Sequence, residues 1–398
     1  MYRRTNTPNP PAAFFDNSNP EGERLRRAAA SAAVDDMVKW FKNENSTIAI
    51  LDATNSTKMR RQWIKERCDA ERIETLFVES LCNDKSLVMA NIVEVKTTSP
   101  DYVGQDPEAA AKDFLDRIRK YEEVYEPLEA SENLTFIKIV DVGAQVIINA
   151  IRDYIQSRMV YYLMNLHIRP RSIWLSRHGE SEFNLSGQIG GDANLSHRGQ
   201  LYARTLPNLV QESAGDRKLT VWTSTLKRTI QTARFLPFEK LEWKALDELD
   251  SGVCDGLTYG EIEAQYPADF RARDEDKYNY RYLGGESYRD VVTRLEPIIM
   301  ELERSENIII VTHQAVIRCI YAYFMNMAQE KSPWMEVPLH TLIRLTPGPY
   351  KTDEQRWKAN IPAVSTWRGK GSAAKHQESP LGTPGTELPE PVMKANAT

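Results

Sequence analysis

The sequence predicts an α/β protein of two domains, in which parallel strands alternate with helices. The chain has 398 residues, more than a single domain usually holds. Strand-like apolar runs alternate with helix-like runs along most of it, and two of these strands end at a histidine, His178 and His313. We expect domains at residues 1–165 and 168–367. The Pro-, Gly-, Ser- and Thr-rich tail at 368–398 is expected to be disordered.

The first domain opens on "STIAILDATNST", which is typical of a buried strand that ends in a polar turn. Helical patterns with a charged face follow, and Pro127 closes one of them. We expect strands at 46–57, 72–82 and 134–143, and helices at 58–70, 106–128 and 144–167.

The second domain repeats the alternation, beginning with the apolar strand "SIWLS". Strand, helix, strand, helix is the rhythm of a doubly wound sheet. We expect strands at 172–176, 219–224 and 307–313, and helices at 195–213, 225–236, 286–305 and 314–328.

Composition limits the classes of function. With 41% hydrophobic and 27% charged residues and a net charge of −5, the chain is unsuited to binding nucleic acid over its whole surface. No apolar run approaches the roughly 20 residues that span a bilayer, and the N-terminus has no signal-peptide core. The four cysteines form no CxxC pair, which favours reduced thiols and a cytoplasmic location.

The two strand-end histidines indicate phosphoryl-transfer chemistry. Ligands of open α/β sheets bind beyond the carboxyl ends of the strands, where His178 and His313 lie together with Arg177 and Arg228. A neutral imidazole is a good nucleophile near pH 7, and arginines neutralise the phosphate charge that opposes attack. A carboxylic acid can protonate the leaving alkoxide, and "DELDSGVCDGLTYGE" offers Glu248 for that step.

Metal binding is the competing explanation for such histidines. The six histidines form no HxH or HExxH pattern, so we expect no metal site.

These residues also carry a resemblance to a known family. The run Arg177-His178-Gly179-Glu180 resembles the RHGE signature of the histidine phosphatase superfamily, which includes the phosphoglycerate mutases. The ordered set "RHGESEFN", "VWTS.LKRTIQTA", "DELDSGVCDGLTYGEI", "RDEDKYNYRYLGGESY" and "THQAVIRC" resembles the bisphosphatase half of the 6-phosphofructo-2-kinase/fructose-2,6-bisphosphatase family.

The resemblance implies a phosphoglycerate-mutase-like α/β domain that hydrolyses the 2-phosphate of fructose 2,6-bisphosphate through a phosphohistidine. The products would be fructose 6-phosphate and phosphate, no cofactor would be needed, and the activity would control glycolysis and gluconeogenesis. His178 matches the nucleophile and Glu248 the proton donor. Around the 2-phosphate the matching residues are Arg177, Asn184, Arg228 and His313, with Gly190 as a backbone contact; for the sugar and its 6-phosphate they are Tyr259, Arg273, Lys277, Tyr288, Gln314 and Arg318.

The sequence around the residues expected to bind the sugar and its 6-phosphate agrees with the resemblance. The run "RARDEDKYNYRY" mixes cations with tyrosines. Charged runs are usually solvated surface, but tyrosine hydroxyls can donate to phosphate oxygens, so a phosphate pocket is favoured.

The first domain resembles the kinase half of the same family, a P-loop-kinase-like parallel sheet. Asp52 and Cys82 match kinase-site positions. The fructose 6-phosphate contacts match Thr54, Arg60, Arg117 and Tyr121, and a nucleotide-contacting stretch matches Asn91 and Lys96.

The phosphate-binding loop of that fold, GxxxxGK[ST], is absent from the sequence. In the family the loop lies upstream of the segment that matches "MYRR", so the first domain is expected to be truncated. ATP and Mg²⁺, which the resemblance implies, would then have no cradle, and we expect kinase activity to be lost.

Other functions stay open. One alternative is a bifunctional kinase and phosphatase with residual ATP binding, and another is a mutase-like or broader sugar-phosphate phosphatase. A third is a regulatory or dimerising protein with an inactive kinase half. Whether the chain forms a homodimer also stays open.

Overall fold

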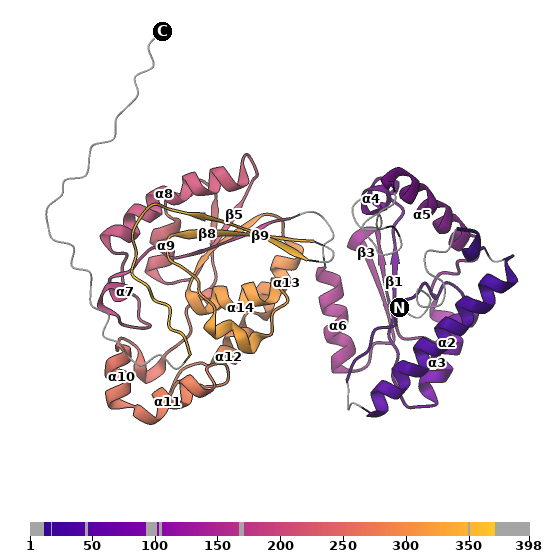
Figure 1. Ribbon diagram of the computed structural model, residues 1–398, viewed down its shortest axis with the longest axis horizontal. Helices are drawn as coiled ribbons and strands as arrows, with labels where there is room; N and C mark the ends of the chain where they lie inside the picture. Colours follow the sequence, from indigo (N-terminus) through magenta and orange to yellow (C-terminus); the bar gives the residue numbers. More distant parts are fainter. Residues whose placement is uncertain are drawn as a thin grey trace, which may run out of the picture. The chain divides into compact units, whose positions relative to one another are not determined.

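A computed structural model describes residues 12–16, 18–43, 47–92, 102, 106–166, 171–348 and 351–370. The chain forms two compact units, Met1–Arg169 and Pro170–Thr398, each built of strands and helices (Figure 1). The mixed α/β class predicted from the sequence is confirmed. No helix in the described ranges combines the length and the apolar character needed to cross a bilayer.

The first unit contains a three-stranded sheet in the order β1-β2-β3. β1 (Phe77–Leu81) pairs in parallel with β2 (Phe136–Val140), and β3 (Gln145–Asn149) pairs antiparallel with β2. The helices of this unit are α2 (Pro20–Asn43), α3 (Lys58–Asp69), α4 (Lys85–Asn91), α5 (Pro107–Glu122) and α6 (Tyr154–Asn165), with 3₁₀ turns at Ala12–Phe15, Ala130–Glu132 and Asp141–Gly143.

Side-chain caps fix where several of these helices begin. The Arg60 backbone N–H donates to Thr57 Oγ1 at 3.2 Å, which starts α3. The Ala109 N–H donates to Asp106 Oδ2 at 2.9 Å, and Pro107 occupies the first turn of α5. Each cap satisfies a backbone donor that the helix leaves unpaired.

Two predictions in the first unit are wrong. Residues 47–57 contain no strand, and the side chains of Ile48 and Ile50 are exposed. An apolar run forms a buried strand only beside a partner strand, and no strand among the described residues pairs with this run. The single helix expected at 144–167 is instead β3 followed by α6. Its β-branched start, "QVIIN", pairs with β2, and the Asp153 carboxylate caps a new helix by accepting from Gln156 N at 2.8 Å.

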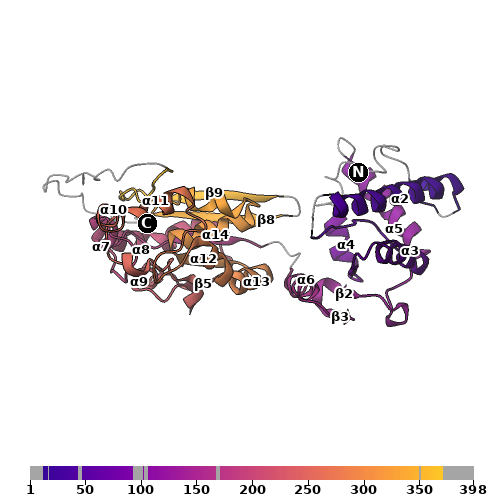
Figure 2. The same cartoon turned by 90° about the horizontal axis from the view of Figure 1, so that it is seen from below.

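The second unit is built on a six-stranded sheet in the order β6-β5-β7-β4-β8-β9. The first four of these run parallel, whereas β8 pairs antiparallel with β4 and β9 antiparallel with β8. The last two strands lie side by side in Figure 2. The strands are β4 (Ile173–Arg177), β5 (Thr220–Thr223), β6 (Glu239–Glu242), β7 (Ile308–Thr312), β8 (Thr341–Pro347) and β9 (Thr352–Lys358).

Helices cover both faces of this sheet (Figure 1). Successive strand residues point to opposite faces, so Ile173 and Leu175 pack in one apolar cluster with α12–α14, and Trp174 in another with α8. The helices are α7 (Glu182–Ser186), α8 (His197–Ala214), α9 (Lys227–Ala233), α10 (Tyr259–Gln265), α11 (Pro267–Glu275), α12 (Tyr288–Arg294), α13 (Glu296–Arg304) and α14 (Gln314–Phe324).

The helix expected at 286–305 is divided in two, which corrects the prediction. α12 ends at Arg294 and α13 begins at Glu296, because Pro297 has no N–H to continue a helical ladder and is suited to a first turn. The break leaves Arg294 at a helix end, a position that matters for the site.

Candidate active site

His178 and His313 meet at the carboxyl ends of adjacent parallel strands. His178 follows the last residue of β4 and His313 the last residue of β7. The backbone N–H of His178 donates to the Thr312 carbonyl at 2.9 Å, and the imidazole ring centroids are 5.2 Å apart. Both side chains are buried. Parallel pairing of β4 with β7 therefore joins two residues that lie far apart in the sequence.

Hydrogen bonding defines which nitrogen of His178 can attack. Its Nδ1 lies 2.8 Å from the Gly179 carbonyl oxygen. A carbonyl oxygen only accepts, so Nδ1 carries the proton and Nε2 carries the lone pair. Burial, followed by the charges of Arg228 and Arg177, lowers the pKa of His178 well below its usual value. The imidazole is consequently neutral at physiological pH.

His313 belongs to a chain of hydroxyl groups behind the site. Its Nε2 lies 2.7 Å from Ser224 Oγ, and Ser224 Oγ lies 2.8 Å from Thr229 Oγ1. Thr229 Oγ1 donates to the Leu226 carbonyl at 2.8 Å, so it accepts from Ser224, and Ser224 accepts from His313 Nε2–H. His313 Nδ1 is buried without a hydrogen-bond partner among the described residues, which leaves that nitrogen to a ligand.

Two buried arginines flank the histidines. Arg177 donates to the Val337 carbonyl at 2.7 Å and to Thr366 Oγ1 at 2.8 Å, and Arg228 donates to the Gly191 carbonyl at 2.6 Å. Burial lowers the pKa of Arg177 to about 9. Because these hydrogen-bond partners are neutral, both guanidinium groups keep their charge for an incoming anion.

Glu248 supplies a carboxyl group beside these cations. It lies on the segment 245–250, near enough to both Arg177 and Arg228 to interact with them electrostatically. Its Oε1 accepts from the backbone N–H of Leu249 at 2.9 Å and from that of Ala315, in the first turn of α14, at 3.2 Å. Oε2 accepts no hydrogen bond from the described residues, so it is the oxygen left for proton transfer.

Close backbone approach requires glycine at position 179, and a positive φ favours it at position 190. A Cβ on Gly179 would lie 2.6 Å from the Gly199 carbonyl oxygen, and one on Gly190 would lie 1.7 Å from Asp255 Oδ1. Gly190 also has a φ of +71°, which disfavours other residues. The turn after the nucleophile and the loop opposite it therefore need glycine.

A single cavity of about 1070 Å³ gathers the predicted phosphatase residues. Its lining includes all of them except His313, which lies behind His178. These are Arg177, His178, Asn184, Gly190, Arg228, Glu248, Tyr259, Arg273, Lys277, Tyr288, Gln314 and Arg318.

A second group of basic side chains lines the same cavity. Arg273 Nε donates to Tyr282 Oη at 2.7 Å and its Nη2 to Tyr259 Oη at 3.0 Å. Arg318 Nη1 donates to Tyr288 Oη at 2.8 Å. Phenol groups hold these arginines in place without cancelling their charge. Tyr282 was not predicted, although it lies in the tyrosine-rich run that drew attention to this region.

Lys277 is the most perturbed of these cations. Its Nζ donates to the Pro333 carbonyl at 2.9 Å and lies 4.6 Å from the centre of the Trp334 ring. Burial, followed by the charges of Arg273 and Arg318, lowers its pKa to about 5. Without a ligand, the Lys277 amine is therefore neutral at physiological pH.

Sequence reasoning missed the segment 361–370, which crosses the cavity. Residues Pro362–Gly369 line it, and the Val364 N–H donates to Glu180 Oε2 at 3.0 Å. The Arg368 guanidinium stacks 4.7 Å from the centre of the Tyr259 ring. Arg368 and Gly369 of the expected disordered tail are thus part of the site, and residues 371–398 lie outside the described residues. No local pattern signals this segment, because the contacts that hold it here join it to residues far away in the sequence.

Glu180 anchors this segment to the nucleophile loop. It is fully buried and accepts from Ser196 Oγ at 2.8 Å and from two nitrogens of Arg198, each at 2.8 Å. Its backbone N–H donates to His340 Nε2 at 3.1 Å. The last residue of the RHGE run therefore has a role that sequence reasoning left unassigned.

The residues predicted for the kinase half are more scattered than the phosphatase residues. Arg117 and Tyr121, both on α5, contact the Phe15 ring at 4.6 and 6.0 Å. Asp52 and Thr54 lie in the segment 47–57 and make no hydrogen bond to either of them within the described part of the chain. Of the others, Arg60 is on α3, Cys82 follows β1, Asn91 ends α4, and Lys96 lies outside the described residues.

Residue types that bind metals do not cluster in the described ranges. No group of three or more His, Cys, Asp or Glu side chains there could hold a metal ion. The histidine pair is instead surrounded by arginines, which suit an anion.

Comparison with known proteins relates both units to described families. Residues 1–170 match the family model for 6-phosphofructo-2-kinase, and residues 173–360 match that for the histidine phosphatase superfamily, branch 1. A fructose-2,6-bisphosphatase of Saccharomyces cerevisiae is 57% identical over 376 residues, 94% of this chain and 83% of the relative. A 6-phosphofructo-2-kinase/fructose-2,6-bisphosphatase of Gallus gallus is 48% identical over 357 residues, 89% of this chain and 76% of the relative.

The α-ribazole phosphatase of Shigella flexneri covers 49% of this chain and 99% of its own, with 23% identity and a TM-score of 0.42.

Proposed function

The chain belongs to the 6-phosphofructo-2-kinase/fructose-2,6-bisphosphatase family, and on that premise we propose that it hydrolyses the 2-phosphate of fructose 2,6-bisphosphate. The products are fructose 6-phosphate and orthophosphate. One observation carries the proposal: a single cavity is lined by a nucleophilic imidazole, by the two arginines that flank it, and by a second basic group of Arg273, Lys277 and Arg318. Two basic groups in one cavity, the second of which includes a lysine that gains its charge when an anion binds, suit a substrate with two phosphates.

The first step transfers the phosphoryl group to His178. The Nε2 lone pair attacks the phosphorus of the 2-phosphate, and the bond from phosphorus to O2 of the sugar breaks. Arg177 and Arg228 neutralise the charge that spreads over the phosphoryl oxygens. The electron pair of the broken bond goes to O2, which takes the proton of Glu248 Oε2–H and leaves as fructose 6-phosphate.

The second step regenerates the protein. A water molecule attacks the phosphohistidine, the bond from nitrogen to phosphorus breaks, and its electron pair returns to His178 Nε2. The Glu248 carboxylate now acts as base and accepts a proton from the water. Orthophosphate leaves, and His178 is neutral again, in keeping with its lowered pKa.

The cationic group formed by Arg273, Lys277 and Arg318 distinguishes this reaction from general monophosphatase or mutase activity. These side chains would hold the 6-phosphate, which does not react, and that binding energy would orient the 2-phosphate for attack. The test is a panel of phosphate esters offered to the pure protein. Fructose 2,6-bisphosphate should be hydrolysed to fructose 6-phosphate, which should not react further. Equal rates with 3-phosphoglycerate or fructose 6-phosphate would contradict the proposal.

For these 398 residues by themselves we propose no kinase turnover, although residues 1–170 match the kinase family model. The support is chemical: the sequence contains no GxxxxGK[ST] run, and that run supplies the backbone amides, the lysine and the Mg²⁺-binding hydroxyl that phosphoryl transfer from ATP requires in this fold. Measurable ATP-dependent turnover would favour the bifunctional alternative.

A cytoplasmic location is proposed on the state of the thiols. All four cysteines, Cys68, Cys82, Cys254 and Cys319, are free, as expected in a reducing compartment. A homodimer stays a prediction.

A further inference from the structure

The carboxyl group of Glu248 is carried by a short segment that has little regular structure. Residues 245–250 run from a 3₁₀ turn, Lys244–Leu246, toward the next, Gly252–Cys254. A general acid must be held close to its target, because a displacement of about 1 Å can lower a rate by about 10²-fold. Some other element must therefore fix this segment.

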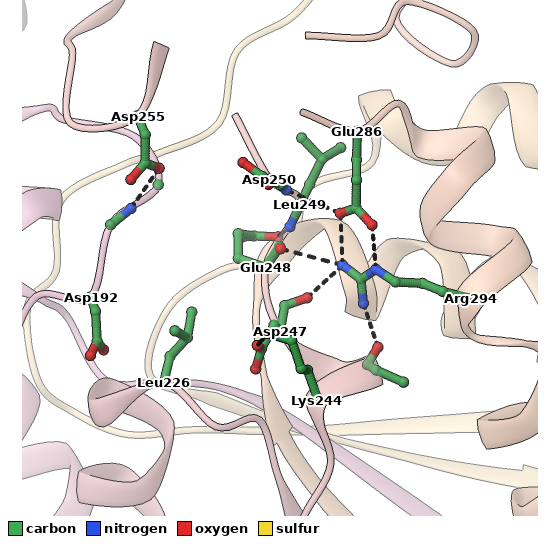
Figure 3. A pocket seen from close by; sticks show the side chains of 13 residues that line it. Asp192, Leu226, Lys244, Asp247, Glu248, Leu249, Asp250, Asp255, Glu286 and Arg294 are labelled. Atoms are coloured by element: carbon green, nitrogen blue, oxygen red, sulfur yellow. Dashed lines mark hydrogen bonds and ion pairs between the residues drawn. The ribbon is translucent and has the colours of Figure 1, made fainter. Parts of the chain in front are cut away.

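Arg294 makes contacts suited to that task (Figure 3). Its Nη2 donates to the backbone carbonyl of Asp247 at 2.7 Å and to that of Glu248 at 3.3 Å. Its Nη1 donates to the Ala245 carbonyl. One guanidinium group thus binds three carbonyls within four consecutive residues of the acid-bearing segment.

Glu286 orients the guanidinium and contacts the same segment. Its carboxylate accepts from Arg294 Nε at 2.8 Å and from Nη2 at 3.2 Å. It also accepts from the Asp250 backbone N–H at 3.1 Å, and the Glu286 N–H donates to the Asp250 carbonyl at 2.9 Å. The side chains of Arg294 and Glu286 are only about a fifth exposed, at 22% and 23%, so water competes little for the hydrogen bonds between them.

This pair approaches Glu248 from outside the substrate cavity. A separate hollow of about 530 Å³ is lined by Arg294, Glu286 and Glu248, whereas the large cavity is lined by Glu248 but by neither Arg294 nor Glu286. Arg294 is therefore not among the residues that line the substrate cavity, and it approaches the acid-bearing segment from the neighbouring hollow.

We propose that Arg294, held by Glu286, is a positioning residue that fixes Glu248 for proton transfer by binding the carbonyls of residues 245, 247 and 248. The inference rests on the proposed function, in which Glu248 protonates the leaving sugar oxygen. Arg294 supplies no proton and binds no phosphate; it holds the carboxyl where O2 departs.

The experiment is a double-mutant cycle on the rate of phosphoenzyme formation in single turnovers of fructose 2,6-bisphosphate. Arg294→Gln should slow this step by about 10- to 100-fold in the wild-type background. In a Glu248→Gln background, where no acid is left to position, the same change should cost less than about threefold. Substrate affinity should be unchanged, since Arg294 lies outside the large cavity.

Two outcomes would overturn the inference: equal losses in both backgrounds, as general damage to the fold would cause, or no loss in the wild-type background. Arg294→Lys separates charge from geometry, because it keeps the charge but cannot bind three carbonyls and Glu286 together; a wild-type rate in that variant would also overturn it. Lys244→Gln is the matched control and should leave the rate unchanged. It removes a cation that lines the same hollow and that forms an ion pair with the Asp247 carboxylate at 3.3 Å.

If Arg294→Gln does not fold, as judged by thermal unfolding, Glu286→Gln replaces it in the same cycle with the same criteria. Phosphoenzyme formation by the wild-type protein shows whether a negative result concerns this inference or the proposed function. If it forms no phosphoenzyme from fructose 2,6-bisphosphate, the proposed function fails; if it does form one and the cycle is additive, only the inference about Arg294 fails.

Discussion

Binding of a sugar phosphate should draw one proton from solution, because Lys277 is neutral until an anion reaches it. With a pKa of about 5 in the ligand-free protein, only about one Lys277 amine in a thousand is charged at pH 8. A phosphate dianion within hydrogen-bond reach favours the charged form. The free ester has a second pKa near 6 and is already ionised at pH 8, so the ligand itself releases no proton.

Calorimetric titration with fructose 6-phosphate at pH 8, in buffers of different ionisation enthalpy, measures this proton. The observed heat should vary with the ionisation enthalpy of the buffer with a slope of about one proton per ligand bound. Lys277→Arg is the matched control, because an arginine stays charged throughout, and its slope should be close to zero. A zero slope for the wild-type protein, or an unchanged slope in Lys277→Met, would refute the role given to Lys277.

Two further predictions concern pH and nucleotide. The pKa of His178 is lowered in the folded state, so below pH 6.5 the unfolded state binds more protons than the folded state. The stability that neutral His178 allows is therefore complete above pH 6.5 and decreases as pH falls. Denaturant unfolding below pH 6.5 should show a steeper fall in stability for the wild-type protein than for His178→Ala, by at most about 1.4 kcal/mol per pH unit, and parallel pH curves would contradict the lowered pKa of His178. Incubation of the His178→Ala variant, which cannot hydrolyse the product by the proposed route, with ATP, Mg²⁺ and fructose 6-phosphate should give no fructose 2,6-bisphosphate; detectable product from the pure variant would contradict the proposal that these 398 residues lack kinase turnover.

The centre of the second unit could be predicted from sequence because its signals are local. β4 and β7 are buried on both faces, so they appear as short continuous apolar runs. A polar residue directly after such a run lies at the carboxyl edge of the sheet. Because His178 and His313 each follow such a run, they could be predicted to lie together. The outer strand β6 was missed because "EKLE" is exposed along its whole length and carries no apolar pattern.

The parts that could not be predicted depend on tertiary contacts. The run "QVIIN" was assigned to a helix although its partner, β2, makes it a strand. Arg294 shows no pattern of its own, since its role comes from three backbone carbonyls that lie 46 to 49 positions away in the sequence. Lys277 could be identified as a cation near phosphate by resemblance, but its neutrality follows only from burial beside Arg273 and Arg318.

The measurement that tests the central claim most directly is rapid acid-free quenching of the protein with substrate labelled in the 2-phosphate, followed by peptide mapping. The account predicts one labelled peptide, with the phosphoryl group on Nε2 of His178, because Nδ1 is occupied by its hydrogen bond to Gly179. Label on another residue, or turnover that persists in His178→Ala, would contradict it.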